Sequence, residues 1–514
     1  MPSTASGGAS FTVILDDEAG LRGLVAEIAG MLEPGDLVTL SGDLGAGKTA
    51  FTRAAIHFLA GDETISVPSP TFTLMQSYDL PRFPVVHADL YRLSGETELA
   101  ELGLDDLPAD AVIFMEWPDR AGALLPPDRI DIALMMVPKA GLQVRNVRVT
   151  GYGKAAARVE RIGALRRFLA ENGYADAKRQ RVPGDASTRS YQRIGTGADA
   201  VILMDSPRRP DGPPVRDGKP YSAIAHLAED VRPFIAIAKG LRSYGFSAPE
   251  IFHFDLERGF VLLEDLGNQL IVQDDPPRPI EERYAAAVEA LAAMHTQPLP
   301  HILPVTEDTA YDIPWYEMDA FLIEAELLLE WFIPRCGGSV PAAARKAFVA
   351  LWHEALQPAI DAIPTWVLRD FHSPNLLWLP RRSDVGRIGL LDFQDALIGP
   401  GAYDLASLLQ DARVDVPEMM ELTLLSRYAQ LRRAADEEFD APSFVALYST
   451  LAAQRATKIL GIFARLDKRD GKPQYLRHMP RVWNYLQRSL AHPALGELAA
   501  WYKLYVPELK ATKD

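Results

Sequence analysis

The sequence predicts an α/β protein that is built from unlike domains. Its 514 residues are too many for one hydrophobic core, so two to four domains are expected. Residues 11 to about 150 alternate β-rich runs with helical segments, which is typical of a sheet covered by helices. Short strands follow, and from about residue 280 the chain is mostly helical, with Leu- and Ala-rich amphipathic runs.

The composition is that of an ordinary soluble globular protein, with 48% apolar and 24% charged residues. The single cysteine, Cys336, excludes an internal disulfide and a cysteine-based zinc site, and it suits a reducing compartment. The first ten residues lack the basic and apolar regions of a signal peptide, and no apolar run is long enough to span a bilayer. We therefore expect a cytoplasmic protein without a membrane partner.

The formal net charge of −16 argues against a protein that grips nucleic acid through many phosphate contacts. A role near RNA would then need partner subunits to supply most of the positive surface. Any contact with tRNA is expected to be indirect.

A change of character in the segment "GYGKAAARVE", residues 151–160, places a domain boundary near residue 156. The predicted domains are residues 1–156 and residues 157–514. The second begins with a β-rich small lobe and continues into a helical large lobe. Within the β-rich part, residues 205–220 are rich in Pro, Gly and charge, and we expect an exposed loop there.

A phosphate-binding loop, "GDLGAGKT", lies in the first domain between a β-rich run and a helical segment. It fits G-x-x-x-x-G-K-[ST] at every fixed position, so it predicts a P-loop NTPase domain that binds ATP. Its glycines let backbone N–H groups turn toward the phosphates, Lys48 would reach the β- and γ-phosphates, and the Thr49 hydroxyl would bind Mg²⁺. The predicted nucleotide-binding residues are Gly42, Asp43, Gly45, Ala46, Gly47, Lys48 and Thr49.

Three further stretches resemble the TsaE family, the small ATPase of bacterial tRNA threonylcarbamoyladenosine synthesis: "SVPSPTFTLMQSY", "HADLYRL" and "VIFMEWPDR". Together with the loop and with "ELAELGLDDL", they cover nearly the whole first domain. The resemblance implies ATP hydrolysis in an assembly with TsaB- and TsaD-like proteins.

Three residues carry over from this resemblance as catalytic or metal-binding groups. Asp89 ends a predicted strand and would hold Mg²⁺ directly or through water. Thr71 would sense the γ-phosphate, as a switch threonine does. Glu116 would orient or deprotonate the attacking water, and its alternative role is to cap a neighbouring backbone.

The second domain contains the stretch "WVLRDFHSPNLLWL" and, after it, "IGLLDFQDALIGPGAYDLASLL". Asp370 and Asn375 have the D-x-x-x-x-N spacing of a kinase catalytic loop, and Asp392 leaves a predicted strand as the metal-binding aspartate of kinases does. Asp370 would accept or orient the substrate hydroxyl proton, while Asn375 and Asp392 would hold Mg²⁺ against the ATP phosphates. The order of motifs predicts a bilobal protein-kinase-like fold of the aminoglycoside phosphotransferase branch.

Two features depart from the kinase pattern. The triplet before the catalytic loop is Leu368-Arg369-Asp370 rather than His-Arg-Asp or His-Gly-Asp. The strand that should carry the phosphate-pairing lysine has Met204 at that place, so either another cation neutralises the α- and β-phosphates or ATP is held more weakly. Arg189 and Arg193 are the candidates.

The segments "GDASTRSYQRI", "VILMDSP" and "RDFHSPNLLWLP" are similar to the AmgK family, anomeric kinases of N-acetylmuramate and N-acetylglucosamine in cell-wall recycling. The resemblance implies transfer of the γ-phosphate of ATP to the C1 hydroxyl of an amino sugar. No sugar-binding residue can be named from the sequence. Asp395 and Glu264 are carboxylates near the expected cleft, and structural hydrogen bonding explains them at least as well.

Two alternatives stay open for the second domain. A kinase of this fold could instead phosphorylate an aminoglycoside or a choline-like alcohol. It could also be a non-catalytic scaffold that regulates the ATPase, although the intact Asp370, Asn375 and Asp392 argue against that role.

Overall fold

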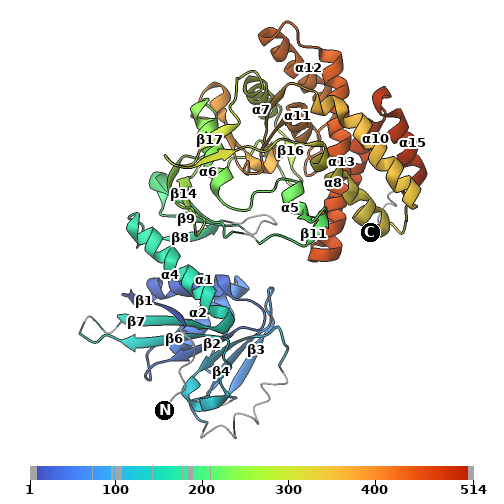
Figure 1. Ribbon diagram of the computed structural model, residues 1–514. Coiled ribbons are helices and arrows are strands. Elements are labelled where there is room, and N and C mark those ends of the chain that lie inside the picture. The colour runs from blue at the N-terminus through green and yellow to red at the C-terminus, as the bar shows by residue number, and fades with distance from the viewer. Residues whose placement is uncertain are drawn as a thin grey trace. The chain divides into compact units, whose positions relative to one another are not determined.

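The protein is described by a computed structural model that covers residues 8–71, 73–93, 98, 107–139, 141, 143–175, 177–182, 189–208 and 210–507 (Figure 1). The described residues form two compact units. The first contains residues 8–180 and 194–197, and the second contains residues 181–193 and 198–507. Each unit has its own hydrophobic core.

The first unit is built on a seven-stranded mixed sheet with the order β1-β7-β6-β2-β5-β4-β3. β2 runs parallel to β5 and β6, and β4 runs parallel to β5, while the outer strands are antiparallel. The strands are β1 (Ala9–Leu15), β2 (Leu37–Ser41), β3 (Met75–Tyr78), β4 (Val85–Asp89), β5 (Val112–Glu116), β6 (Arg129–Met136) and β7 (Arg145–Tyr152). This is the central sheet that the alternating pattern predicts.

Three helices accompany this sheet: α1 (Glu18–Met31), α2 (Lys48–Ala60) and α4 (Ala156–Glu171). Short 3₁₀ turns are η2 (Pro118–Leu124) and η3 (Gly153–Ala155). The Asp17 side chain caps α1, because its carboxylate accepts a hydrogen bond from the Gly20 N–H at 2.9 Å. Phe51 and Ile56 of α2 pack with Phe114 of β5 in the core.

Helix α4 belongs to the first unit. It packs against β1 and β7, and Arg158 on its first turns forms an ion pair with Asp36 at 2.6 Å. The compact unit therefore extends to residue 180. The functional boundary near residue 156 stays a prediction.

The β-rich part of the second unit is a five-stranded sheet of order β13-β14-β10-β9-β8. Its strands are β8 (Arg179–Val182), β9 (Ser190–Ile194), β10 (Val201–Asp205), β13 (Ile251–Asp255) and β14 (Phe260–Glu264). Two-stranded ribbons pair β11 (Pro214–Arg216) with β12 (Lys219–Pro220), β15 (Val272–Gln273) with β16 (Arg278–Pro279), β17 (Ile302–Pro304) with β18 (Ala310–Asp312), β19 (Pro364–Val367) with β22 (Leu397–Pro400), and β20 (Leu376–Trp378) with β21 (Ile388–Leu390).

The remainder of the second unit is helical. Its helices are α5 (Tyr221–Ile224), α6 (Arg232–Ser243), α7 (Glu281–Met294), α8 (Met318–Leu327), α9 (Ile333–Arg335), α10 (Ala342–Ile360), α11 (Ala402–Leu409), α12 (Glu418–Ala435), α13 (Ala441–Asp470), α14 (Met479–Leu490) and α15 (Gly496–Tyr505). The turns are η4 (Gly197–Asp199), η5 (Leu328–Phe332), η6 (Ser373–Asn375), η7 (Asp384–Arg387), η8 (Pro473–His478) and η9 (Pro493–Leu495).

Helix α13 is the centre of this helical part, and α8, α10, α11 and α14 all pack against it (Figure 1). Its middle turns are buried from Thr450 to Thr457. No helix among the described residues is both long enough and apolar enough to cross a membrane. A β-rich part followed by a helical part is the order that the sequence predicts.

Candidate functional site

The phosphate-binding loop joins the end of β2 to the start of α2. Gly42 has φ +138°, and a Cβ on it would collide with the carbonyl oxygen of Leu134. Gly47 caps α2 in a left-handed conformation with φ +107°. Only glycine takes both conformations readily, so these positions explain the glycines of the motif.

Lys48 is buried within this loop, with 5% of its surface exposed. Its ammonium donates hydrogen bonds to the carbonyl oxygens of Gly42 at 2.7 Å and Asp43 at 2.9 Å. It also lies over the ring of Trp117, 3.7 Å from the centroid. Burial lowers the pKa of Lys48, and the nearby carboxylates of Glu116 and Asp89 partly oppose this. The loop is therefore formed around a cation that anionic phosphate oxygens would attract.

Glu116 and Asp89 lie beside this lysine because of the parallel strands. The carboxyl ends of parallel strands meet at one edge of a sheet, and Asp89 of β4 is paired in register with Glu116 of β5. Thr49 donates a hydrogen bond to Glu116 Oε2 at 3.0 Å. The fully buried His87 contacts the other oxygen, Oε1, at 2.9 Å. His87 thus orients Glu116, a role that the sequence analysis did not assign.

Asp89 is nearly fully buried, and both of its carboxylate oxygens accept hydrogen bonds. Ser69 donates to Oδ2 at 2.8 Å, and the backbone N–H of Tyr91 donates to Oδ1 at 3.0 Å. The Ser69 hydroxyl also lies 3.1 Å from that of Thr71. Ser69 therefore links Thr71 to Asp89. The sequence predicts no role for Ser69, although this serine stands only two residues before Thr71.

The oxygen groups at this edge fit a magnesium ion. Mg²⁺ in nucleotide sites is usually bound through one or two carboxylates and hydroxyls together with substrate phosphates. The Thr49 hydroxyl and the Asp89 carboxylate are such ligands: Thr49 contacts Glu116, and the charges of Asp89 and Glu116 both act on Lys48. The predicted residues of the first domain are thus one cluster, and their individual roles stay predictions.

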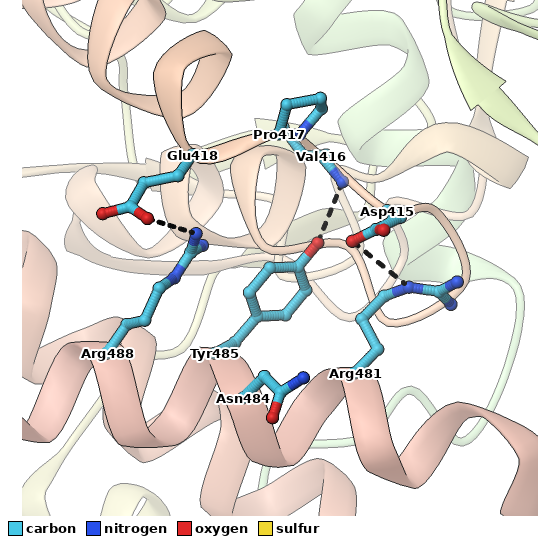
Figure 2. A pocket seen from close by; sticks show the side chains of 8 residues that line it. All are labelled: Asp415, Val416, Pro417, Glu418, Arg481, Asn484, Tyr485 and Arg488. Carbon is cyan, nitrogen blue, oxygen red and sulfur yellow. Dashed lines mark hydrogen bonds and ion pairs between the residues drawn. The ribbon is translucent and has the colours of Figure 1, made fainter.

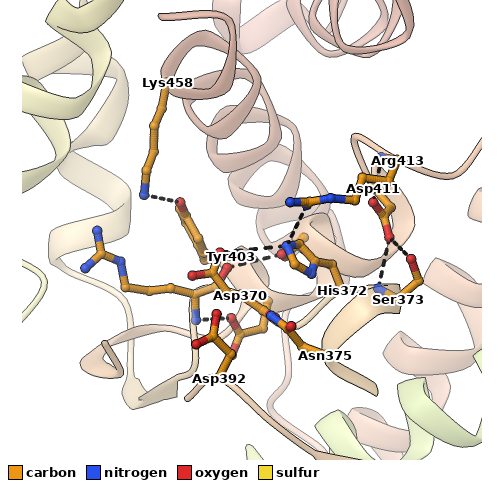
Figure 3. A network of polar contacts seen from close by, with 12 residues as sticks. Asp370, His372, Ser373, Asn375, Asp392, Tyr403, Asp411, Arg413 and Lys458 are labelled. Carbon is orange, nitrogen blue, oxygen red and sulfur yellow. Dashed lines mark hydrogen bonds and ion pairs between the residues drawn. The ribbon is translucent and has the colours of Figure 1, made fainter. Parts of the chain in front are cut away.

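In the second unit, Asp370 and Asn375 lie in the loop between β19 and β20 (Figure 3). The Asn375 side-chain amide donates to the backbone carbonyl of Asp370 at 3.0 Å. The backbone carbonyl of Asn375 accepts from the N–H of Leu391 at 2.9 Å, which ties this loop to the residue before Asp392. The Asp370 carboxylate keeps 42% of its side-chain surface exposed, so a substrate can reach it.

Asp392 has an arginine as its partner. Arg189 donates to Asp392 Oδ1 at 2.9 Å, and Gln394 donates to the same oxygen at 3.0 Å. Burial raises the pKa of Asp392, and the charge of Arg189 opposes this. Arg193 instead contacts Asp265 at 2.5 Å. Of the two cations suggested by the sequence, the structure brings Arg189 to the site.

Met204 lies in the hydrophobic core, 1% exposed, opposite Val261 of β14. It therefore takes no part in a polar site. The two carboxylates named as possible cleft residues have structural partners: Asp395 accepts from the Ala228 N–H at 2.7 Å, and Glu264 pairs with Arg382 and, at 3.3 Å, with Arg242.

Buried polar groups outside the catalytic loop form hydrogen bonds with its residues Leu368 and Arg369. Asp404 of α11 accepts hydrogen bonds from the backbone N–H groups of Leu368 at 2.6 Å and Arg369 at 2.8 Å. Burial raises the pKa of Asp404 to about 7, although both of these N–H groups lower it. The Arg369 guanidinium contacts Glu324 and donates to the carbonyl of Ala225 at 2.9 Å. The sequence analysis noted the "GAYDLA" segment but gave Asp404 no role.

His372 lies in the same loop, two residues after Asp370. Its Nε2 lies 3.9 Å from Asp370 Oδ1 and accepts a hydrogen bond from Arg413 at 3.3 Å (Figure 3). Burial lowers the pKa of His372 to about 4, so the ring is neutral at neutral pH. For Asp370, desolvation by the surrounding protein raises the pKa, but the positive charges of Lys458, Arg455 and Arg369 are among the groups that lower it overall. The Asp370 carboxylate is consequently ionised and can accept a proton.

A separate pocket of about 330 Å³ lies between α14 and the segment before α12 (Figure 2). Tyr485 closes it by accepting from the Val416 N–H at 3.0 Å. Its charged groups already pair across it: Arg481 with Asp415 and Arg488 with Glu418, each at 3.9 Å. It contains none of the predicted site residues.

Two family models match the chain. Residues 15–143 match the threonylcarbamoyl adenosine biosynthesis protein TsaE. Residues 178–438, about half of the chain, match the phosphotransferase enzyme family. The α/β fold class and the kinase-like second domain are thereby confirmed.

Curated relatives divide in the same way. An N-acetylmuramate/N-acetylglucosamine kinase of Caulobacter vibrioides is 38% identical over 68% of this chain and 97% of its own length. The kinase of the same name from Pseudomonas aeruginosa is 32% identical over 61% of this chain and 84% of its own. A tRNA threonylcarbamoyladenosine biosynthesis protein TsaE of Rickettsia bellii is 39% identical over 24% of this chain and 85% of its own. The chain therefore belongs to the phosphotransferase enzyme family and carries a TsaE-type ATPase domain ahead of the kinase domain.

Proposed function

We propose that the second domain transfers the γ-phosphate of ATP to the anomeric hydroxyl of N-acetylmuramate or N-acetylglucosamine, in cell-wall recycling. The observation that carries this proposal is the cluster of Asp370, Asn375 and Asp392. It lies in a chain that is 38% identical to a kinase named for these sugars, over 68% of this chain and 97% of that kinase.

Each residue of the cluster has a proposed task. The Asp370 carboxylate orients the C1 hydroxyl and collects its proton, which is easier than with an ordinary alcohol because an anomeric hydroxyl is more acidic. Asn375 and Asp392 hold Mg²⁺ against the phosphates of ATP. Arg189, which contacts Asp392, supplies the positive charge that Met204 cannot.

The test uses the full chain, radiolabelled ATP and four acceptors: N-acetylmuramate, N-acetylglucosamine, kanamycin and choline. We expect transfer to the two amino sugars, with phosphorus NMR showing a sugar 1-phosphate, and a loss of roughly 100-fold or more in Asp370→Asn because proton acceptance is removed. Transfer only to kanamycin or choline would replace the proposed substrate. Transfer to none of the four would refute the proposal.

We propose that the first domain is the ATPase of a tRNA threonylcarbamoyladenosine assembly with TsaB- and TsaD-like partners. Lys48 and the loop bind the phosphates, Thr49 and Asp89 hold Mg²⁺, Thr71 senses the γ-phosphate and Glu116 orients the attacking water. The contacts of Glu116 with Thr49 and His87 support a role in the site rather than as a backbone cap. The domain residues are 1–156, and the protein acts in the cytoplasm.

This second proposal is tested by reconstitution with TsaB- and TsaD-like proteins, tRNA, threonine, bicarbonate and ATP. The full chain is expected to support formation of the modified nucleoside, measured by mass spectrometry of digested tRNA. Lys48→Ala should abolish it, because the loop then lacks its phosphate-binding cation. Equal yields with and without the chain would contradict the proposal.

A further inference from the structure

Arg455 is a buried cation on α13 that has no partner among the residues the structure describes. Only 5% of its surface is exposed, yet its guanidinium forms no hydrogen bond or ion pair with any residue in the described part of the chain. None of its nitrogens belongs to the partnerless polar atoms that are sealed from solvent. The stem of the side chain is therefore enclosed, while its charged end reaches a space that solvent enters. Burying such a charge costs free energy of folding unless a group of opposite charge, such as a ligand, pairs with it.

The position of α13 places this group beside the catalytic loop. The helix packs against α11, whose Asp404 holds the backbone of Leu368 and Arg369. Lys458 follows Arg455 by three residues, so the two lie on neighbouring parts of one helix face. Lys458 reaches the Tyr403 hydroxyl at 3.3 Å (Figure 3), and its charge acts on Asp370. The charge of Arg455 acts on both Asp370 and His372.

The other cations around this loop are paired. Lys458 and Arg369 share Glu324, the first at 2.8 Å. Arg413 contacts His372 at 3.3 Å, and Arg189 contacts Asp392 at 2.9 Å. Arg189 thus marks the metal and nucleotide side of the site. Arg455 comes from the helical part, on the side of Asp370 and His372, where the acceptor has to lie.

The two proposed acceptors differ by one charged group. N-acetylmuramate carries a lactyl ether that ends in a carboxylate, whereas N-acetylglucosamine has a hydroxyl at the same carbon. A guanidinium binds a carboxylate through two parallel, charge-assisted hydrogen bonds. We propose, on the basis of the kinase function above, that Arg455 binds this carboxylate and thereby determines the preference for N-acetylmuramate over N-acetylglucosamine.

The test compares kcat/KM for both sugars in the full-length wild type, Arg455→Met, Arg455→Lys and the control Lys468→Met. The control removes a positive charge from an exposed position on the same helix. Arg455→Met should lower kcat/KM for N-acetylmuramate by roughly 10- to 100-fold more than for N-acetylglucosamine. Arg455→Lys should retain part of the preference for N-acetylmuramate, because lysine keeps the positive charge. An unchanged preference would overturn the inference. An equal fall in kcat/KM for both sugars would also overturn it, because Arg455 would then act on Asp370 or on the phosphates.

A second measurement keeps the inference testable if the Arg455 variants do not fold. The wild type is assayed with N-acetylmuramate whose carboxylate is converted to the neutral carboxamide. KM should rise roughly tenfold or more, and an unchanged KM would overturn the inference. Wild type that phosphorylates neither sugar would refute the kinase proposal itself, whereas an active wild type with an unaltered preference in Arg455→Met would refute only the role of Arg455.

Discussion

At the scale of single residues, Asp392 is paired with a cation from a distant part of the sequence. Arg189 and Asp392 are 203 positions apart and contact each other at 2.9 Å. The strand position where a lysine would be expected holds the buried Met204 instead. Arg189 is therefore the cation that the fold brings to Asp392, from a segment far from it in the sequence.

We predict that Arg189→Ala raises KM for ATP by roughly tenfold or more, because a charged hydrogen-bonding group near the phosphates is lost. The matched control is Arg193→Ala, which removes an arginine that pairs with Asp265 outside the cluster. Initial rates at varied ATP measure the effect. Equal rises in KM for the two variants would show that Arg189 has no special place at the nucleotide.

At the scale of elements, α13 carries both a site residue and a close helix contact. Gly461 lies where α13 crosses the end of α8, and a Cβ there would stand 2.5 Å from the carbonyl carbon of Leu327. Neighbouring backbone cannot move aside as a flexible side chain can. The glycine lets the helix that bears Arg455 and Lys458 lie close to the end of α8.

We predict that Gly461→Ala destabilises the protein by about 1–3 kcal/mol, the usual cost of overpacking a core. Gly23→Ala on α1 is the control, since a Cβ there meets nothing within 4 Å and alanine favours a helix. Scanning calorimetry should show a lower unfolding temperature only for Gly461→Ala. An unchanged thermogram for that variant would mean that α13 does not need this close approach.

At the scale of the whole molecule, two unrelated phosphate sites lie in separate compact units. The cluster around Lys48 belongs to residues 8–180, and the cluster around Asp370, with Arg189, belongs to residues 181–193 and 198–507. No residue is shared between the two clusters. Joint expression without communication is the simplest reason for the fusion.

Crossed variants test this independence. Lys48→Ala in the full chain should abolish tRNA modification but leave sugar phosphorylation within about twofold, and Asp370→Asn should do the reverse, because each change removes a group from one site only. The two assays are run on the same preparations. A collapse of sugar phosphorylation in Lys48→Ala would show that the two sites are coupled.

Much of both sites could be predicted because their residues stand in short motifs. The predicted residues lie at the ends of strands or in the loops that follow them: the phosphate loop, Asp89, Glu116, Asp370, Asn375 and Asp392. Groups that support them were missed, namely Ser69, His87 and Asp404, because hydrogen bonding by a serine, a buried histidine or a helical aspartate leaves no local pattern.

The sequence alone determined that the chain joins two ATP-using domains, since the spacing of glycines, lysine and carboxylates is dictated by phosphates and magnesium. Only the tertiary structure decided between Arg189 and Arg193, and only it left Arg455 buried on α13 with no partner in the described part of the chain. The physical reason is that charge pairing depends on distances between segments far apart in the chain, which are set when the sheet and the helices pack.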